Sequence, residues 1–201
     1  MLPRASFPQP FIDLFMVKMG MSETEFDFFC THFKPLTLRK KDFYIKEGSI
    51  TNAKAYVKKG CGRSFIIDKN GKERITNFVF EDWWLGDYES YYSGNPGKTN
   101  TQAIEDMEVF EIVKPDFIKL EEEIPKLKLW YDLKMKKHSF AIINQLYEVK
   151  TSTCEERYLD LIKKHPTIFQ RVPLQYIASY IDMEPQSLSR LRKRLQENES
   201  A

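Results

Sequence analysis

The chain has 201 residues, of which 42% are hydrophobic and 14% aromatic, enough for one core of about 120–150 residues and a small second domain. Its net charge of +2 excludes a polybasic protein, so any binding of DNA must depend on a local patch of cations. No apolar run is long enough to span a membrane, and the sequence has no secretion signal, catalytic motif or nucleotide-binding motif. We therefore expect a cytoplasmic protein that is not an enzyme.

The cysteines and histidines give no pattern of metal ligands. The cysteines are scattered without a C-x-x-C pair, so we expect reduced thiols and no iron–sulfur cluster. The sequence does not exclude a bound haem, because a histidine can ligate its iron. No feature of the sequence marks one of the histidines as such a ligand. The sequence thus predicts no metal site and no required cofactor. The cysteines and histidines considered are Cys30, Cys61, Cys154, His32, His138 and His165.

The N-terminal part is predicted to be helical over residues 11–32. A short apolar stretch runs from Phe11 to Met19. A second helical segment starts after Ser22, which is a candidate N-cap with Glu25 as its partner in a capping box.

From residue 33 the hydrophobic period changes to two, which predicts strands. They are expected at residues 33–38, 43–45, 55–57, 64–67, 75–80 and 109–113. Asn70-Gly71, between two apolar runs, is a strong signal for a hairpin. Many short antiparallel strands with polar turns indicate a small barrel or sandwich.

Two helices are expected next, a short one at 116–123 and a long one from Pro125 to about Val149. In the long helix, six positions are spaced four, three, four, three and four residues apart, which is a heptad seam with one polar position. A helix packed on its own domain needs the same stripe, but this helix is too long for a small barrel to cover. We therefore favour pairing with a second copy through Leu129, Leu133, Lys136, Phe140, Ile143 and Tyr147.

A third helix is predicted at 155–164, since Thr153 and Glu156 form a capping box and His165-Pro166 ends the pattern. The stretch 171–195 then predicts two short helices joined by a tight turn. Only the small Ala178 stands where the two crossing helices would touch, and the second helix starts at Glu184-Pro185. This is the layout of a helix-turn-helix whose second helix enters the major groove. A packed two-helix hairpin is the alternative.

The order of a helical lead, a barrel, a long helix and a helix-turn-helix resembles the cyclic-AMP receptor protein and FNR family of bacterial transcription regulators, in the form common among Bacteroidetes. The barrel motifs that carry the resemblance are Lys46-Glu47-Gly48, Gly60, Asp68-x-x-Gly71-Lys72-Glu73 and Trp84-x-Gly86-Asp87. The implied fold class is α+β. It combines an N-terminal antiparallel β-barrel of the cyclic-nucleotide-binding jelly-roll type (1–124), a dimerisation helix (125–150) and a C-terminal helix-turn-helix of the winged-helix type (151–201).

The resemblance implies a homodimer that binds a near-palindromic site on double-stranded DNA, with RNA polymerase as a candidate partner. Pro185, Gln186 and Arg190 stand at positions where members of the family contact base edges. Ser187 stands at a position that contacts a phosphate, and Ser189 is a candidate for an additional contact. Arginine can bind guanine and glutamine can bind adenine through two hydrogen bonds each. Further phosphate contacts are expected from the cations behind them, Arg192, Lys193 and Arg194.

The expected effector region departs from the family pattern. Gly86-Asp87 replaces the Gly-Glu pair that binds a ribose, and the place of the phosphate-binding arginine falls on Gly97. Lys98 has a single ammonium group and cannot form the paired hydrogen bonds that an arginine guanidinium makes with a phosphate. We therefore expect an effector, if there is one, other than cyclic AMP. The candidate pocket residues are Trp84, Gly86, Asp87, Tyr88, Lys98 and Thr99.

Two questions stay open at this level. The aromatic residues of the segment 83–92 form either a ligand pocket or the core of the barrel, and we favour the core. The modest net charge, Pro185, and Asp182 in place of the usual turn glycine also allow another class of protein. This would be a small-molecule-binding or protein-interaction module with a degenerate helix-turn-helix.

Overall fold

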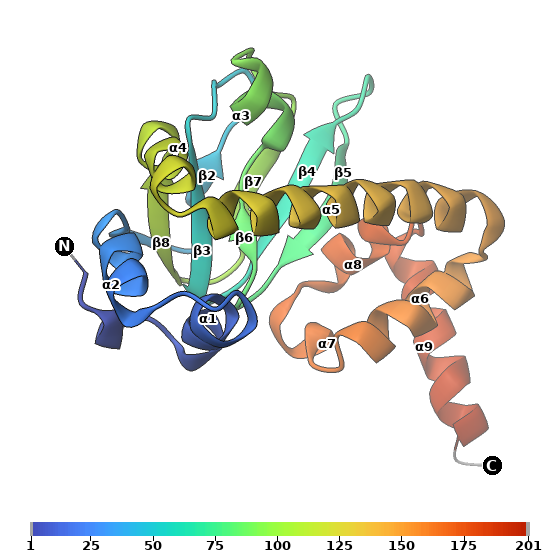
Figure 1. Ribbon diagram of the computed structural model, residues 1–201. Coiled ribbons are helices and arrows are strands. Elements are labelled where there is room, and N and C mark those ends of the chain that lie inside the picture. The colour runs from blue at the N-terminus through green and yellow to red at the C-terminus, as the bar shows by residue number, and fades with distance from the viewer. Residues whose placement is uncertain (1, 200–201) are drawn as a thin grey trace. The chain divides into compact units, whose positions relative to one another are not determined.

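The computed structural model describes residues 2–199, with the side chains of Gln145, Asn198 and Glu199 left out. Two compact units make up the chain. The first comprises Met1–Ser64 and Phe78–His138, and the second comprises Phe65–Asn77 and Ser139–Ala201. Both helices and antiparallel strands are present (Figure 1), so the predicted α+β class is confirmed.

The N-terminal lead of the first unit is helical, as predicted, but it is broken into pieces. Gly20, with a φ of +74°, separates the last helix from the others. Ser22 caps that helix as expected: its Oγ accepts a hydrogen bond from the Glu25 amide at 3.2 Å, and the Glu25 carboxylate accepts one from the Ser22 amide at 2.7 Å. The pieces are a 3₁₀ turn η1 (Arg4–Ser6), α1 (Gln9–Ile12), a π-helical segment η2 (Asp13–Lys18) and α2 (Glu23–Thr31).

Eight strands follow, and they form two four-stranded sheets with the orders β1-β8-β3-β6 and β2-β7-β4-β5. The six predicted strands are all present. The predicted barrel is wrong in one respect, because the described strands form two separate sheets and do not close into one. Short edge strands explain this, since β6 has two residues and β2 has three with a register shift. The strands are β1 (Lys34–Leu38), β2 (Phe43–Ile45), β3 (Ala53–Lys59), β4 (Gly62–Ile67), β5 (Glu73–Val79), β6 (Trp84–Leu85), β7 (Asn100–Ala103) and β8 (Met107–Val113).

Alternation along β3 and β8 divides the first unit into two cores. The inner face of the sheets carries Ala55, Val57 and Val109, which pack with Leu38 and Met107. The outer face carries Tyr56, Phe110 and Ile112, which pack against the phenylalanines of the N-terminal helices. In Figure 1, α1 and α2 lie beside these strands. Burial of a large aromatic side chain contributes roughly 1.5–3 kcal/mol, so the lead is an integral part of the unit.

Three helices complete the first unit: α3 (Tyr88–Ser93), α4 (Lys114–Glu123) and the first half of α5 (Pro125–Thr151). The short helix α3 was not predicted. Its N-cap is Asp87, whose Oδ1 accepts a hydrogen bond from the Ser90 amide at 3.1 Å. Within residues 2–199, none of the helices combines the length and the apolar composition that crossing a bilayer requires.

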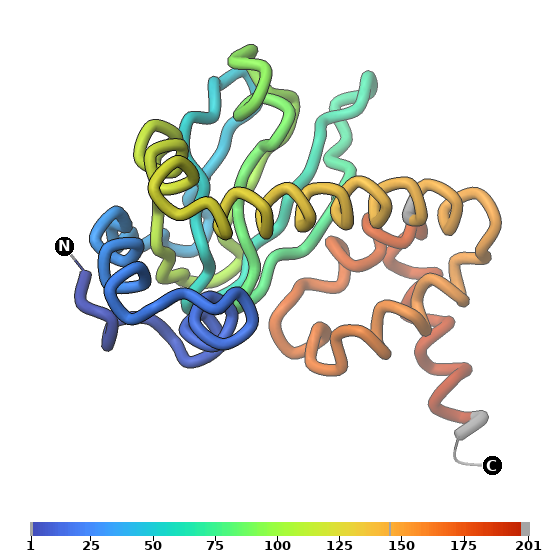
Figure 2. The backbone as a smooth tube through the Cα atoms, in the orientation of Figure 1, coloured from blue at the N-terminus to red at the C-terminus, as the bar shows by residue number. Residues whose placement is uncertain are grey.

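The second unit combines the tip of the β4–β5 hairpin with the C-terminal helices, through which the chain passes in order (Figure 2). The hairpin turn is as predicted, with Gly71 at a φ of +76°. The capping box of Thr153 and Glu156 is also confirmed. The helices after α5 are α6 (Cys154–Lys164), α7 (Ile168–Arg171), α8 (Leu174–Tyr180) and α9 (Pro185–Glu199).

The winged-helix form expected for this part is not what the described residues show. No strand occurs between residues 151 and 199. The connection between α6 and α8 forms the short helix α7 because Ile168 turns into the core, where it is fully buried. After the turn, α9 continues as a helix to Glu199.

Candidate nucleic-acid interface

The two helices α8 and α9 are joined through the apolar residues that the sequence singled out. Ile177, Ala178 and Ile181 are fully buried on the α8 side, and Leu188 is fully buried on the α9 side. Ala178 has the smallest side chain that still excludes water from such a contact, so the helix backbones can approach closely. The pair is therefore held by its inner face, and the outer face of α9 is left to polar residues.

The turn between α8 and α9 has the left-handed residue that the sequence suggested. Asp182 has a φ of +59°, a conformation that aspartate tolerates better than most residues. The amide of Met183 donates to the Ala178 carbonyl at 2.8 Å, which closes the turn. Pro185 then begins α9, where its missing N–H costs nothing.

Four of the predicted DNA-contacting side chains lie together on the outer face of α9. Gln186, Ser189, Arg190 and Lys193 are all exposed. Their spacing of three and four residues places them on one stripe of the helix. We call these four residues the reading stripe. It offers hydrogen-bonding groups at the start of the helix and positive charge behind them.

The other predicted contacts are placed differently. Arg192 is half-buried, and its guanidinium carbon lies 4.0 Å from the centroid of the Phe169 ring. Arg194 is exposed but forms an ion pair with Glu155 of α6. Pro185 and Ser187 are half-buried at the start of the helix. The structure thus separates the reading stripe from two arginines that stabilise the packing of α9.

Cations from the β4–β5 hairpin lie against the turn before α9. Arg74 Nη1 is 3.4 Å from Asp182 Oδ1, and Lys72 Nζ is 3.2 Å from Glu184 Oε1. Ser179 of α8 adds a link, since its Oγ accepts a hydrogen bond from the Ile75 amide at 3.2 Å. The two acidic groups beside the reading stripe are therefore partly neutralised within this unit.

The predicted dimerisation seam on α5 is exposed. Leu129 is 65% exposed and Phe140 is 66% exposed, although both are large and apolar. The side of α5 that packs within the first unit is a different one, which carries Leu127 and Tyr131. An apolar stripe distinct from the buried face is what a helix that pairs with a second copy requires. The remaining seam residues, Leu133, Lys136, Ile143 and Tyr147, are exposed as well.

The expected effector region has a buried acidic group at its centre. Asp87 is 6% exposed, and its Oδ2 has no hydrogen-bond partner among the described residues. A Cβ atom added to Gly97 would lie 2.2 Å from that oxygen. The glycine that takes the place of the family's arginine thus leaves room for a carboxyl group.

The other candidate pocket residues differ in exposure and in their contacts. Lys98 is exposed and Thr99 is half-buried. The ring of Tyr88 lies 5.2 Å from that of His138. Trp84 faces the outer core, 5.7 Å from the ring of Tyr56. A Cβ atom added to Gly86, which precedes Asp87, would lie 3.7 Å from the Cβ of Lys54.

The favoured interpretation of the aromatic segment 83–92 as barrel core is wrong in part. Trp83 is 40% exposed and Tyr92 is 55% exposed. Tyr91 is buried but does not belong to the inner core; Lys54 of β3 and Lys114 of α4 lie near its ring. The inner core is aliphatic instead.

A buried lysine in the same region was not identified from the sequence. Lys54 of β3 is 1% exposed, and its Nζ lies 2.9 Å from the centroid of the Phe117 ring and 3.6 Å from that of Tyr131. Burial lowers the pKa of this amine to about 6. A strand lysine usually indicates an exposed position, so the sequence carries no signal for it.

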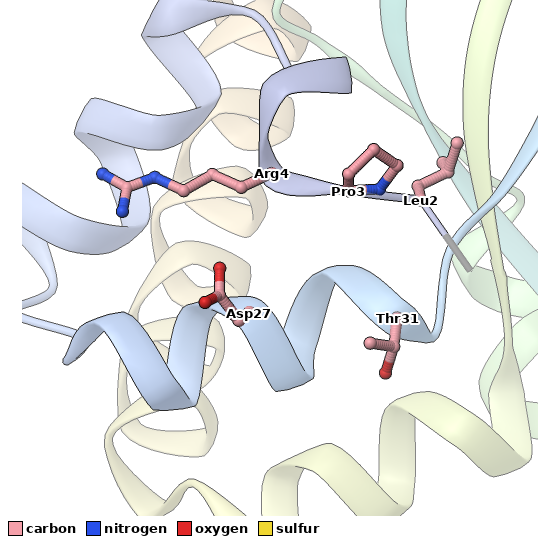
Figure 3. A pocket seen from close by; sticks show the side chains of 5 residues that line it. All are labelled: Leu2, Pro3, Arg4, Asp27 and Thr31. Atoms are coloured by element: carbon pink, nitrogen blue, oxygen red, sulfur yellow. The ribbon is translucent and has the colours of Figure 1, made fainter.

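A surface hollow on the first unit contains none of the predicted site residues. It is lined by Arg4 and its neighbours Leu2 and Pro3, and by Asp27 and Thr31 of α2 (Figure 3). The Arg4 guanidinium is 3.4 Å from the Glu23 carboxylate and stacks near Phe26, so it has structural partners. Among the described residues, no three potential metal ligands come together.

Comparison with known proteins agrees with this architecture. A family model described as the cyclic nucleotide-binding domain matches residues 35–123. Solved structures with the same fold include three regulators. The c-di-GMP-responsive global regulator CLP of Xanthomonas campestris is 12% identical, with a TM-score of 0.70, over 88% of this chain and 93% of that one. FixK2 of Bradyrhizobium japonicum is 16% identical, with a TM-score of 0.69, over 83% and 85%. A protein described as a transcriptional regulator of the Crp/Fnr family from Eubacterium rectale is 11% identical, with a TM-score of 0.66, over 89% and 85%.

No curated protein has a matching sequence. Residues 35–123 match the cyclic nucleotide-binding domain, and the chain shares its fold with these three solved structures. The resemblance inferred from the sequence is thereby confirmed in the domain and in the fold.

Proposed function

We propose that this protein is a sequence-specific DNA-binding transcription regulator that acts as a homodimer. The observation that carries the proposal is the reading stripe, which lies exposed on α9 while the inner face of the same helix is buried against α8. A helix of this kind fits the major groove, where Arg190 can bind guanine O6 and N7, and Gln186 can bind adenine N6 and N7. Ser189 and Lys193 would contact the phosphates beside these bases.

The exposed seam of α5 supports the homodimer. To bind two half-sites on one face of a duplex, two copies paired along α5 would have to hold their α9 helices about one helical turn, or roughly 34 Å, apart. We assign residues 125–150 to this dimerisation helix, residues 1–124 to the sensor domain and residues 151–201 to the DNA-binding domain. RNA polymerase is the partner that such an arrangement would address in activation.

We propose that the sensor domain does not use cyclic AMP as its effector. A cyclic phosphate needs a cation or a cluster of N–H donors in a buried site. This chain has Gly97 in place of the phosphate-binding arginine, and the neighbouring Lys98 is exposed. The same argument disfavours c-di-GMP, to which CLP responds, since that ligand also carries phosphates. An uncharged or cationic small molecule, or no effector at all, agrees better with these residues.

The experiment that tests the proposal is selection of bound duplexes from a random DNA library by the purified protein, at low and moderate salt. We expect enrichment of a two-fold-symmetric sequence with half-sites about one turn apart. The selection is repeated with extract of the source cells, which supplies an obligatory effector. A folded dimer that enriches no sequence in either condition would refute the proposal and would favour a module with a degenerate helix-turn-helix.

A further inference from the structure

One arginine in the second unit joins three segments that meet beside the α8–α9 turn. Arg157 lies in the first turns of α6 and is half-buried. Its Nη1 donates to the carbonyl of Ser152 at 2.6 Å and to that of Val149 at 3.4 Å. Its Nε and Nη2 donate to the carbonyl of Ile181 at 3.2 and 2.9 Å. Nη2 also contacts the Cys154 sulfur at 3.2 Å.

These bonds use all five N–H groups of the guanidinium, and the backbone acceptors stand at the ends of helices. Val149 belongs to the last turn of α5 and Ser152 follows that helix, while Ile181 is the C-cap of α8. Carbonyls at a helix C-terminus have no partner within the helix, so they need one from elsewhere. A planar, permanently charged guanidinium can serve acceptors on two sides at once, whereas a lysine ammonium acts as a single point.

The packing between the end of α5 and α8 leaves a space that Arg157 also lines. A cavity of about 50 Å³ lies there, lined among others by Val149 of α5, Leu161 of α6 and Tyr180 of α8. A space of this size leaves the surrounding side chains without close contact on one side. The only residues between α5 and α6 are Ser152 and Thr153. Across this space, the guanidinium of Arg157 donates hydrogen bonds to carbonyls at the ends of both helices and so links them.

Cys154 contributes a second, weaker link to the same turn. Its sulfur lies 3.7 Å from the Asp182 carbonyl. The start of α6 thus contacts two successive carbonyls, those of Ile181 and Asp182, immediately before α9 begins. These contacts connect the start of α6 to the turn that leads into α9.

We propose that Arg157 is a positioning residue that sets the angle between the dimerisation helix α5 and the reading helix α9, and thereby the spacing of half-sites that the dimer accepts. This inference rests on the proposed function. It goes beyond that function because Arg157 is assigned no contact with DNA. It predicts that the loss of Arg157 changes which spacing is preferred, not how each half-site is read.

The test compares the parent with Arg157→Lys on palindromic duplexes whose half-sites have the preferred spacing, one base pair more, or one base pair less. One base pair turns a half-site by about one tenth of a helical turn. For the parent we expect the altered spacings to weaken binding at least as much as a mismatched base pair does, about 5- to 150-fold. For Arg157→Lys we expect the three affinities to converge to within about threefold, with unchanged binding to a single half-site.

Lys193→Ala is the matched control, because it removes a charge from the reading stripe and leaves Arg157 in place. It should weaken binding to all three duplexes equally and keep the spacing preference. If Arg157→Lys fails to fold, Arg157→Gln is compared in the same way, since glutamine can bond the Ile181 carbonyl or the end of α5 but not both.

The outcomes separate this inference from the proposed function. A variant that melts at a lower temperature, binds all duplexes more weakly and keeps the spacing preference of the parent would show a merely structural role and overturn the inference. A parent that binds no palindrome at all would overturn the proposed function, and the role of Arg157 with it. Convergence of the three affinities in the variant alone would support both.

Discussion

Replacement of the buried Lys54 by methionine should change how the stability of the protein depends on pH. The Lys54 side chain is 1% exposed, and no hydrogen-bond partner for its Nζ occurs among the described residues. Desolvation lowers the pKa of the amine to about 6, against about 10.4 in an unfolded chain. Between these values the unfolded chain binds a proton that the folded chain does not.

The sign of the effect follows from this difference in bound protons. Stability rises with pH wherever the unfolded state binds more protons. Lys54 therefore destabilises the fold most at pH 6 and below, and this penalty fades as the pH approaches 10.4. The slope is about 1.4 kcal/mol per pH unit, so between pH 7 and pH 10 the penalty falls by about 4 kcal/mol as an upper bound. Methionine has a similar volume and no charge, so Lys54→Met removes the penalty.

Urea unfolding of parent and variant at pH 7, 8, 9 and 10 measures this effect. We expect Lys54→Met to be more stable at pH 7, with an advantage that shrinks towards pH 10. The difference between the two proteins cancels the titration of other groups, including the buried tyrosines near Lys54. Two stability curves that run parallel from pH 7 to pH 10 would refute the assignment of a neutral buried amine.

Three further predictions concern the proposed interface. Phe140→Asp places a charge in the exposed seam of α5, so we expect sedimentation to show monomers whose unfolding is nearly unchanged. A variant that remains dimeric would contradict the proposal that the protein dimerises through this seam. Asp182 has a left-handed backbone, so Asp182→Gly should keep the melting temperature, whereas Asp182→Val should lower the free energy of unfolding by about 1–2 kcal/mol; equal melting temperatures for the two variants would contradict this. Lys193→Ala should weaken binding to preferred and scrambled DNA alike and reduce the slope of log affinity against log salt by about one unit, and a loss confined to one sequence would disprove its phosphate contact.

The strands of the sheets were predictable where apolar residues alternate and where turns have a chemical signal. Gly71 marks the hairpin, and both capping boxes formed at the residues that the pattern gave. Strand β7 was missed because Asn100, Thr101 and Gln102 have little apolar character. Its burial comes from neighbouring strands that lie far away in the sequence.

The candidate interface was predictable in kind but not in detail. Periodicity placed the reading stripe on one face of α9. It could not show that Arg192 stacks on Phe169 or that Arg194 pairs with Glu155, because these contacts join residues more than 20 positions apart. The same limit applies to Lys54 and Asp87, whose burial depends on packing around them.

The most direct test of the central claim is a double-mutant cycle between Arg190 and the base pair that it is proposed to read. Affinities are measured for the parent and Arg190→Ala on the preferred site and on a site with that guanine replaced. We expect each single change to cost about 1–3 kcal/mol and the second change to add little once the first is made. Losses that simply add, or an Arg190→Ala protein that discriminates between the two sites as the parent does, would contradict base reading by α9.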